Sequence, residues 1–249
     1  MKGGEASKNM SEPKRLSEIE IISQSLAFME AQKKWNEKIT KPQVKTEAEK
    51  EYYKKVYGEP VPEVPLTYDQ AKGLFWRTAK SLIPEYQIQD KDVYQNLVKY
   101  FFDMESSLDT SKGLLIIGGT GCGKTQVFKA MQQTLFNTSI PSFRICECIN
   151  VEYAIRSGNN VYEDFNYGVV SFDDLGSEQI ETVVFGNRVT VMNEILQLRY
   201  NSFQRSGLKT HLTSNLSEAE IESKYGTRIF DRLKEMCNII IFDWQSFRK

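Results

Sequence analysis

The sequence contains, at residues 118–125, the run Gly118-Gly119-Thr120-Gly121-Cys122-Gly123-Lys124-Thr125. An apolar segment, Leu114-Leu115-Ile116-Ile117, precedes it, and a helical pattern starts near Gln126. A strand, a glycine-rich loop and a helix with the spacing G-x-x-x-x-G-K-T form the pattern of a phosphate-binding loop. Glycines let backbone N–H groups close on phosphate oxygens, and the helix N-terminus adds positive potential there. The run therefore predicts a nucleotide site on an α/β fold.

Two side chains of this loop have predicted roles of their own. We expect Lys124 to reach the β- and γ-phosphates of ATP, and the Thr125 hydroxyl to ligate Mg²⁺. Cys122 is interpreted as a small spacer whose side chain points away. A glycine-rich turn that matches by chance is the alternative, but the flanking strand and helix argue against it. The whole segment 118–126 is predicted to bind the nucleotide.

Composition narrows the class of protein. The 249 residues accommodate one α/β domain and an extension. With 32 Lys and Arg against 33 Asp and Glu, any contact with DNA must come from a local patch. The four cysteines form no zinc-binding pattern, and His211 is the only histidine. Without a signal segment or an apolar run of membrane-spanning length, we expect a reduced, cytoplasmic protein with no membrane partner.

Residues 1–65 are predicted to be an extension and a linker. Ser17 and Glu20 have the spacing of a capping box, which predicts a helix of about twenty residues. Its apolar stripe either packs on its own domain or docks on a partner, and both alternatives stay open. Prolines and a Lys/Glu-dense stretch follow between residues 40 and 66 and favour an extended spacer. We place the domain boundary near residue 65, with the ATPase domain over 66–249.

Hydrophobic periodicity predicts alternating helices and strands after this boundary. Helices are expected over 67–82, 92–106, 126–137, 151–157, 187–206, 217–225 and from Thr227 onward. Strands are expected over 114–117, 142–148, 167–175, 208–212 and 237–242, with Cys146 and Cys148 on one face of the second. Alternation of this kind predicts a three-layer αβα domain with a mostly parallel five-stranded sheet.

Polar residues end two of these strands. Asp173 and Asp174 end the strand after Val170, and Asn215 follows another strand. Ligands bind at the carboxyl ends of parallel strands, so these side chains should face the phosphates. Asp173 is the predicted partner of Mg²⁺, Asp174 orients or activates water, and Asn215 contacts the γ-phosphate or that water. Because aspartate is shorter than the glutamate of many ATPases, slow hydrolysis is expected.

Two arginines lie four residues apart near the C-terminus, Arg228 and Arg232. They project from one helical face, which is either a solvated face or a subunit contact. Core-like residues flank Arg232, which favours an arginine finger that completes a neighbouring subunit's site.

Several motifs in fixed order resemble one family. After the phosphate loop come Asp173-Asp174-Leu175-Gly176, Thr213-Ser214-Asn215-Leu216, Tyr225-Gly226-Thr227-Arg228-Ile229-Phe230-Asp231-Arg232-Leu233 and Phe242-Asp243-Trp244-Gln245-Ser246-Phe247-Arg248. Over residues 66–249 the sequence resembles AAA+ ATPases of the DnaC type, the bacterial replicative helicase loaders, and their transposon-encoded relatives of the IstB type.

The resemblance implies a role for each matching residue. Asp173 would bind the metal and Asp174 would be the catalytic acid. Asn215 would be the first sensor, Arg232 the trans-acting finger and Arg248 a second sensor that contacts nucleotide. Since the chain stops soon after its last predicted strand, we expect no C-terminal helical lid. A neighbouring subunit or a partner is expected to close the site, and hence self-association through the ATP sites.

The resemblance leaves competing functions. The first is an ATPase, slow and stimulated by partner or DNA, that loads the replicative DNA helicase on single-stranded DNA. For DNA contact the candidates are Arg144, Tyr153, Arg156, Tyr162 and Phe165, although core packing is the expected role of most of the aromatics. The second function is a transposition regulator that marks target DNA for a transposase.

Two further alternatives belong to other classes of protein than the loader and the transposition regulator. A small-molecule phosphotransferase would need an acceptor pocket and a mobile arginine-bearing lid, and no such insertion is evident. A scaffold that binds nucleotide without turnover is the last alternative. A GTPase is not favoured because the sequence has no Asn-Lys-x-Asp motif.

Overall fold

The computed structural model describes residues 66–247 except 137, 139, 157–160, 180–181, 185–186 and 190. The predictions for the N-terminal helix, its Ser17–Glu20 cap and the spacer lie outside these residues, as does Arg248. The boundary near residue 65 stays a prediction.

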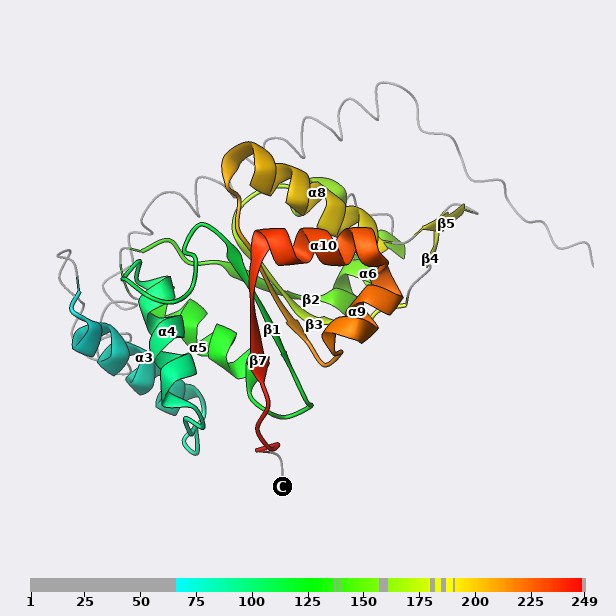
Figure 1. Cartoon of the computed structure of the whole chain (residues 1–249). Coiled ribbons are helices and arrows are strands. Elements are labelled where there is room, and N and C mark those ends of the chain that lie inside the picture. Colours follow the sequence, from blue (N-terminus) through cyan, green and yellow to red (C-terminus); the bar gives the residue numbers. More distant parts are fainter. Residues whose placement is uncertain are drawn as a thin grey trace, which may run out of the picture. The chain divides into compact units, whose positions relative to one another are not determined.

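A five-stranded sheet forms the centre of the domain (Figure 1). Its order is β2-β3-β6-β1-β7, and every described pair is parallel. The strands are β1 (Gly113–Gly118), β2 (Arg144–Glu147), β3 (Val170–Leu175), β6 (Thr210–Ser214) and β7 (Cys237–Phe242). The predicted α/β fold class is confirmed, and the sheet is parallel throughout. Because all strands run the same way, their carboxyl ends share one edge.

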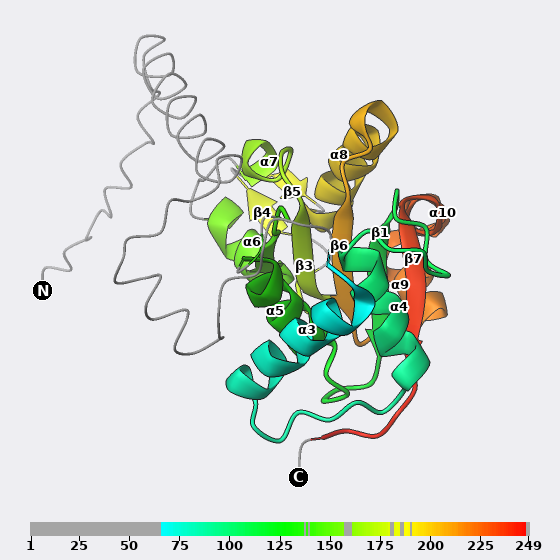
Figure 2. The ribbon, with the colours of Figure 1, turned by 90° about the vertical axis from the view of Figure 1, so that its left-hand side faces the viewer.

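Helices cover both faces of this sheet (Figures 1 and 2). One face carries α3 (Tyr68–Leu82), α4 (Lys91–Phe101) and α5 (Lys124–Phe136). The other carries α6 (Cys148–Arg156), α8 (Val191–Ser206), α9 (Glu218–Tyr225) and α10 (Thr227–Met236), and the short α7 (Val161–Asp164) lies beside them.

The interior strand β1 shows why two layers of helices form. Leu114 and Ile116 belong to the hydrophobic cluster with α3, α4 and α5. Leu115 and Ile117 belong to the cluster with α8, α9 and α10. All four side chains are buried, since successive residues of a strand point to opposite faces. No described helix is long and apolar enough to cross a membrane.

Local capping signals account for two helix starts. Thr67 and Gln70 form the capping box of α3, and Ser217 and Glu220 form that of α9. Gly226 ends α9 as predicted, with φ 87°. Thr227 was expected to cap the last helix, but the N-cap is Gly226 and makes no side-chain hydrogen bond. Thr227 is instead the first helical residue.

Three predicted elements differ from the structure. Residues 187–206 were expected to form one helix, but α8 starts only at Val191, after an antiparallel pair of β4 (Thr182–Val184) and β5 (Asn187–Val189). β-Branched residues of 182–189 favour strands over helix, which explains the difference. The second predicted helix ends at Phe101 rather than 106. Cys148 begins α6 and does not share a strand face with Cys146.

Arg199 is the largest fully buried side chain and has a structural role. Its guanidinium donates to the Thr210 hydroxyl at 2.8 Å and to the carbonyls of Phe165 and Gly168 at 3.0 Å. Burial lowers the pKa of Arg199 to about 10. These contacts tie α8 to the starts of β3 and β6, at the edge opposite to the predicted site.

Candidate nucleotide-binding site

Lys124 lies at the centre of the phosphate loop. Its side chain is only 6% exposed. The ammonium donates to the carbonyls of Gly118 at 2.8 Å and Gly119 at 2.9 Å, and to Asn215 Oδ1 at 2.7 Å. All three acceptors are neutral, so its positive charge has no bonded carboxylate partner among the described residues. Such an ammonium can exchange carbonyl contacts for anionic oxygens.

Thr125 and Asp173 form the second contact of the site. The Thr125 hydroxyl lies 2.8 Å and 3.0 Å from the two carboxylate oxygens of Asp173. The Thr213 hydroxyl donates to Asp173 Oδ1 at 2.7 Å. The end of β3 is thus joined to the start of α5 and to β6. Asp173 is buried, and these hydroxyls hold its carboxylate in one orientation.

Asp174 is presented from an uncommon backbone conformation. Its φ is +59°, in the left-handed region that aspartate tolerates better than most residues. Its N–H donates to the Thr213 hydroxyl at 2.8 Å, and its carboxylate accepts from the Asn215 amide. Burial, and then the charge of Asp173, raise the pKa of Asp174, while Lys124 opposes the shift. A raised pKa suits a carboxylate that accepts a proton.

The residues after β7 lie against the phosphate loop. The Trp244 indole N–H donates to the Cys122 carbonyl at 2.8 Å, and the Phe247 N–H donates to the Gly121 carbonyl at 3.0 Å. Trp244 also packs on Phe242 with ring centroids 4.2 Å apart, and on Tyr94 at 6.3 Å. This C-terminal segment therefore fixes two carbonyls of the loop and connects them to α4.

Trp244→Phe tests this support of the loop. We expect ATP to bind about five-fold more weakly, because one hydrogen bond worth ~1 kcal/mol is lost while the ring is kept. Titration with a fluorescent ATP analogue measures the change. Trp76→Phe is the control, since Trp76 packs on Tyr86 from α3, away from the loop. Equal weakening in both variants would contradict a specific role of Trp244.

The side chains beside the phosphate loop fit a nucleotide that is bound together with Mg²⁺. A hydroxyl and a carboxylate, Thr125 and Asp173, lie together beside the loop, and Mg²⁺ is usually held by one or two carboxylates plus substrate phosphates. Among the described residues no cluster of three or more His, Cys, Asp or Glu side chains could hold a metal alone. A cavity of about 480 Å³ borders Asp173 on the β2 side and includes Glu147 and Asn150.

The structure brings together the predicted residues Lys124, Thr125, Asp173, Asp174 and Asn215, but it does not bring Arg232 to them. Arg232 lies on α10, and its guanidinium stacks over the Tyr200 ring of α8 at 5.0 Å. Its buried Nη1 has no hydrogen-bond partner in the described part of the chain. The predicted role in a neighbouring subunit's site is not a contact of a single chain, so it stays a prediction.

The residues predicted to contact DNA differ in how far their side chains are exposed. Phe165 is buried in the core, and the Arg144 guanidinium lies over its ring at 4.9 Å. Core packing is therefore the role of Phe165, as expected for most of the aromatics. Tyr162 is partly buried against the same core, whereas Tyr153 on α6 is 58% exposed. The Arg156 side chain is outside the described part.

Sequence reasoning missed Thr213, whose hydroxyl connects Asp173 to the Asp174 backbone. Its position two residues before Asn215, at the end of a predicted strand, was the available signal. The C-terminal motif was recognised, but its hydrogen bonds to the phosphate loop were not predictable from spacing. A strand order of β2-β3-β6-β1-β7, with the phosphate loop after β1, decides the fold class. The fold is that of a three-layer αβα P-loop domain with a parallel five-stranded sheet.

No protein-family model and no curated protein sequence matches the chain. Among solved structures, the chain is similar to a DnaC helicase loader, with 20% identity, a TM-score of 0.47, and 63% of this chain and 93% of that chain covered. It is similar to a putative primosome component from Streptococcus pyogenes serotype M3, with 20% identity, a TM-score of 0.49, and coverage of 66% and 85%. It is also similar to AMPPCP-bound DnaA from Aquifex aeolicus, with 14% identity, a TM-score of 0.47, and 65% of this chain and 49% of that chain covered. Loaders of the type that the motifs resemble are thus among these structures, and the likeness concerns the fold.

Proposed function

We propose that the protein binds ATP with Mg²⁺ and hydrolyses it to ADP and phosphate. The observation that carries this proposal is the direct hydrogen bonding among residues from three separate elements. Thr125 bonds to Asp173, Asn215 bonds to both Lys124 and Asp174, and all of them lie at the carboxyl edge of the sheet. In a glycine-rich turn that matched the motif by chance, hydrogen bonds with two carboxylates and an amide would not be expected.

Phosphate binding is the proposed role of Lys124 and the loop. The ammonium would leave the Gly118 and Gly119 carbonyls and turn to the β- and γ-phosphates. The gain is that the ammonium then donates to negatively charged oxygens, so that both partners of each hydrogen bond are ionised. Residues 118–126 supply backbone N–H groups to the same oxygens, and glycine at 121 and 123 permits their φ of 84° and 96°.

Metal binding is the proposed role of Thr125 and Asp173. When bound, Mg²⁺ would neutralise charge on the β- and γ-phosphates. Thr213 keeps the Asp173 carboxylate oriented through its 2.7 Å hydrogen bond. A carboxylate held in this orientation lowers the cost of organising the site for the metal.

Water activation is the proposed role of Asp174, with Asn215 beside it. The Asn215 amide spans the distance between Lys124 and Asp174, donating to the acid and accepting from the ammonium. A water held by Asp174 would attack the γ-phosphate, and the carboxylate would accept its proton. Arg232 of an adjacent copy would stabilise the transferring phosphoryl group, and Arg248 would contact the nucleotide, as the family resemblance implies.

We further propose that this ATPase loads the replicative DNA helicase on single-stranded DNA. The support is the ordered set of motifs from the phosphate loop to the C-terminal segment, which resembles helicase loaders over residues 66–249. Arg232 lies on α10 and stacks over Tyr200 rather than contacting the phosphate loop of its own chain, which suits a site that two chains complete.

The test uses the purified full chain, the replicative helicase of the same host, and circular single-stranded DNA. We expect ATP-dependent transfer of the helicase onto the circle, and ATPase activity that rises with helicase or DNA. Asp174→Asn should bind helicase yet fail to complete a cycle. A complex with a transposase and preference for long duplex DNA, without helicase transfer, would reject the loader and favour the transposition regulator.

The helicase contact can be assigned separately. Deleting residues 1–40 is expected to abolish helicase capture while ATP binding by the remaining chain is kept. Unchanged capture would show that the N-terminal segment is not the docking element. Loss of ATP binding in the same variant would mean instead that the deletion damages the ATPase domain.

A further inference from the structure

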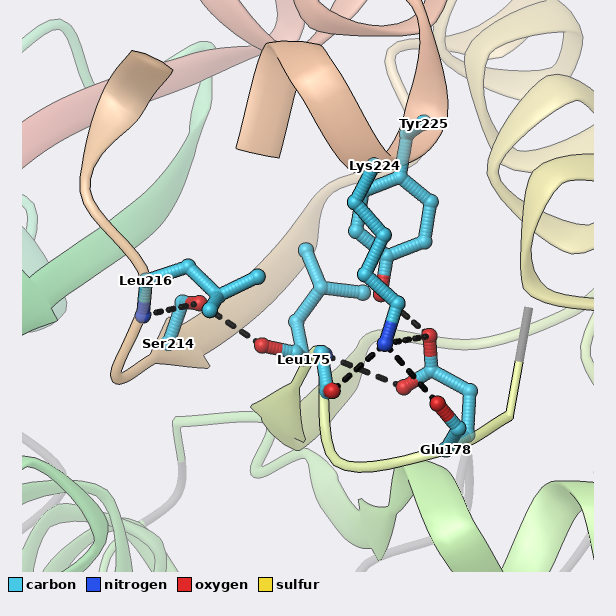
Figure 3. Close-up of polar contacts among 7 residues, drawn as sticks. Leu175, Glu178, Ser214, Leu216, Lys224 and Tyr225 are labelled. Atoms are coloured by element: carbon cyan, nitrogen blue, oxygen red, sulfur yellow. Dashed lines mark hydrogen bonds and ion pairs between the residues drawn. The ribbon is translucent and has the colours of Figure 1, made fainter. Parts of the chain in front are cut away.

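Glu178 lies four residues after Asp174 and is only 4% exposed, although it is not part of the predicted site. Its carboxylate accepts hydrogen bonds from the Tyr225 hydroxyl and, at 3.0 Å, from the Gly176 N–H. Lys224 forms an ion pair with it at 3.7 Å and donates to the Glu178 carbonyl at 2.8 Å (Figure 3). We call Glu178, Lys224 and Tyr225 the α9 latch. It joins the turn that follows Asp174 to the last two residues of α9.

The same turn is held from the end of β6. The Ser214 hydroxyl donates to the Leu175 carbonyl at 2.7 Å and accepts from the Leu216 N–H at 3.1 Å (Figure 3). Gly176 has a φ of +106°, and a Cβ there would lie 2.5 Å from the Leu216 side chain. The turn is therefore packed so closely that it cannot shift without moving β6 or α9.

This packing explains how Asp174 keeps its left-handed backbone. A non-glycine residue at φ +59° persists only where the surroundings over-determine it. The Ser177 N–H closes the turn on the Asp174 carbonyl at 3.0 Å. Glu178 follows Ser177, and its carboxylate is buried. This burial would cost free energy without the hydrogen bond from Tyr225 and the ion pair with Lys224. The contacts with α9 thus hold in place the turn that begins at Asp174.

The latch also connects this turn to the helix with the arginines. After Tyr225 the chain passes one glycine, Gly226, and enters α10, which carries Arg228 and Arg232. The Gly226 carbonyl accepts from the N–H groups of Ile229 and Phe230 at 3.1 Å, so α10 continues directly from the end of α9. A movement of the turn would therefore reach α10 through one short connection.

Resting on the proposed ATPase function, we propose that the α9 latch positions Asp174 for hydrolysis and couples the nucleotide site of one chain to the arginine-bearing helix α10. Glu178, Lys224 and Tyr225 are positioning residues, because their hydrogen bonds and ion pairs among the described residues involve neither the phosphate loop nor Asp173. Through the latch, a change at Asp174 on hydrolysis displaces α10, and with it the contact that Arg228 and Arg232 offer to a neighbouring chain.

The first test separates positioning from general stability. Tyr225→Phe removes one hydroxyl and keeps the ring, and Lys224→Met is a second variant that keeps the length of a partly exposed side chain. We expect kcat for ATP to fall about ten-fold or more, with Kd for ATP within two-fold of wild type. Tyr100→Phe is the control, because it also removes a hydroxyl from a buried tyrosine, one that bonds to the Lys112 carbonyl on the other helical layer. Equal kcat loss in the control, or parallel loss of ATP binding, would overturn the positioning role.

The second test does not depend on turnover. Hydrogen exchange of the full-length chain is followed with and without a slowly hydrolysed ATP analogue and Mg²⁺. In wild type we expect the analogue to protect both the phosphate loop and α10. In Tyr225→Phe the phosphate loop should still be protected, while protection of α10 is lost. Protection of α10 that persists in this variant would overturn the coupling alone. A wild-type phosphate loop without protection would reject the proposed nucleotide site, and the coupling with it.

Discussion

Lys124→Ala is expected to weaken ATP binding about 100-fold, or by ~2.7 kcal/mol. Among the described residues, this ammonium is the one basic group that contacts both the loop carbonyls and Asn215, and it is nearly buried. Without it the β- and γ-phosphates would lose the one cationic side chain that the loop itself supplies. Calorimetric titration of the purified chain with ATP and Mg²⁺ measures the change in Kd.

A matched control distinguishes loss of the phosphate contact from loss of charge. Lys72 on α3 is exposed and lies over the Tyr68 ring at 5.7 Å, so Lys72→Ala removes the same charge elsewhere. Its Kd for ATP should equal that of wild type. ATP binding that is unaffected by Lys124→Ala would reject the assignment of this loop as the nucleotide site.

Asp174→Asn is expected to lower kcat for ATP hydrolysis about 100-fold or more while ATP binding is kept within three-fold. Asparagine preserves the shape and the left-handed backbone, but an amide cannot accept a proton from water. Rapid-quench measurement of a single turnover reports this step directly. If hydrolysis continues at the wild-type rate, Asp174 is not the proton acceptor, and another group must accept the proton of the attacking water.

The pH dependence of the rate tests the same residue. Burial and the neighbouring Asp173 raise the pKa of Asp174 above its ordinary value of 3.8. Because only the ionised form accepts a proton, kcat should fall as the pH drops through this raised pKa. The acidic limb therefore lies at higher pH than an exposed aspartate would give. In Asp174→Asn the residual rate should show no such limb.

Asp103→Asn is the control for the backbone strain at Asp174. Among the described residues, Asp103 is the other non-glycine residue with a positive φ, +53°, and it lies exposed after α4. The same substitution there should leave both kcat and its pH dependence unchanged. A comparable loss in this variant would point to a general effect of the substitution rather than to proton transfer.

Local sequence signals predicted much of the fold because they act over a few residues. Hydrophobic periodicity located α3 and α9, and in the structure a capping box begins each helix, at Thr67 and at Ser217. The prediction of one helix over 187–206 was wrong at its start, because residues 187–189 form β5 and α8 begins only at Val191. The pairing of β5 with β4, a contact between separate segments, decides this.

The sequence by itself determined the phosphate loop, the two acids after β3 and the asparagine after β6, because each is a short motif tied to one strand end. Tertiary structure alone decided what joins them. Thr213 bridges the acids, Trp244 holds the loop from the C-terminal segment, and Glu178 meets α9 across 46 residues of chain. The physical reason is that hydrogen bonds between distant segments leave no periodicity or spacing in the sequence. They arise only when the parallel sheet brings its carboxyl ends to one edge.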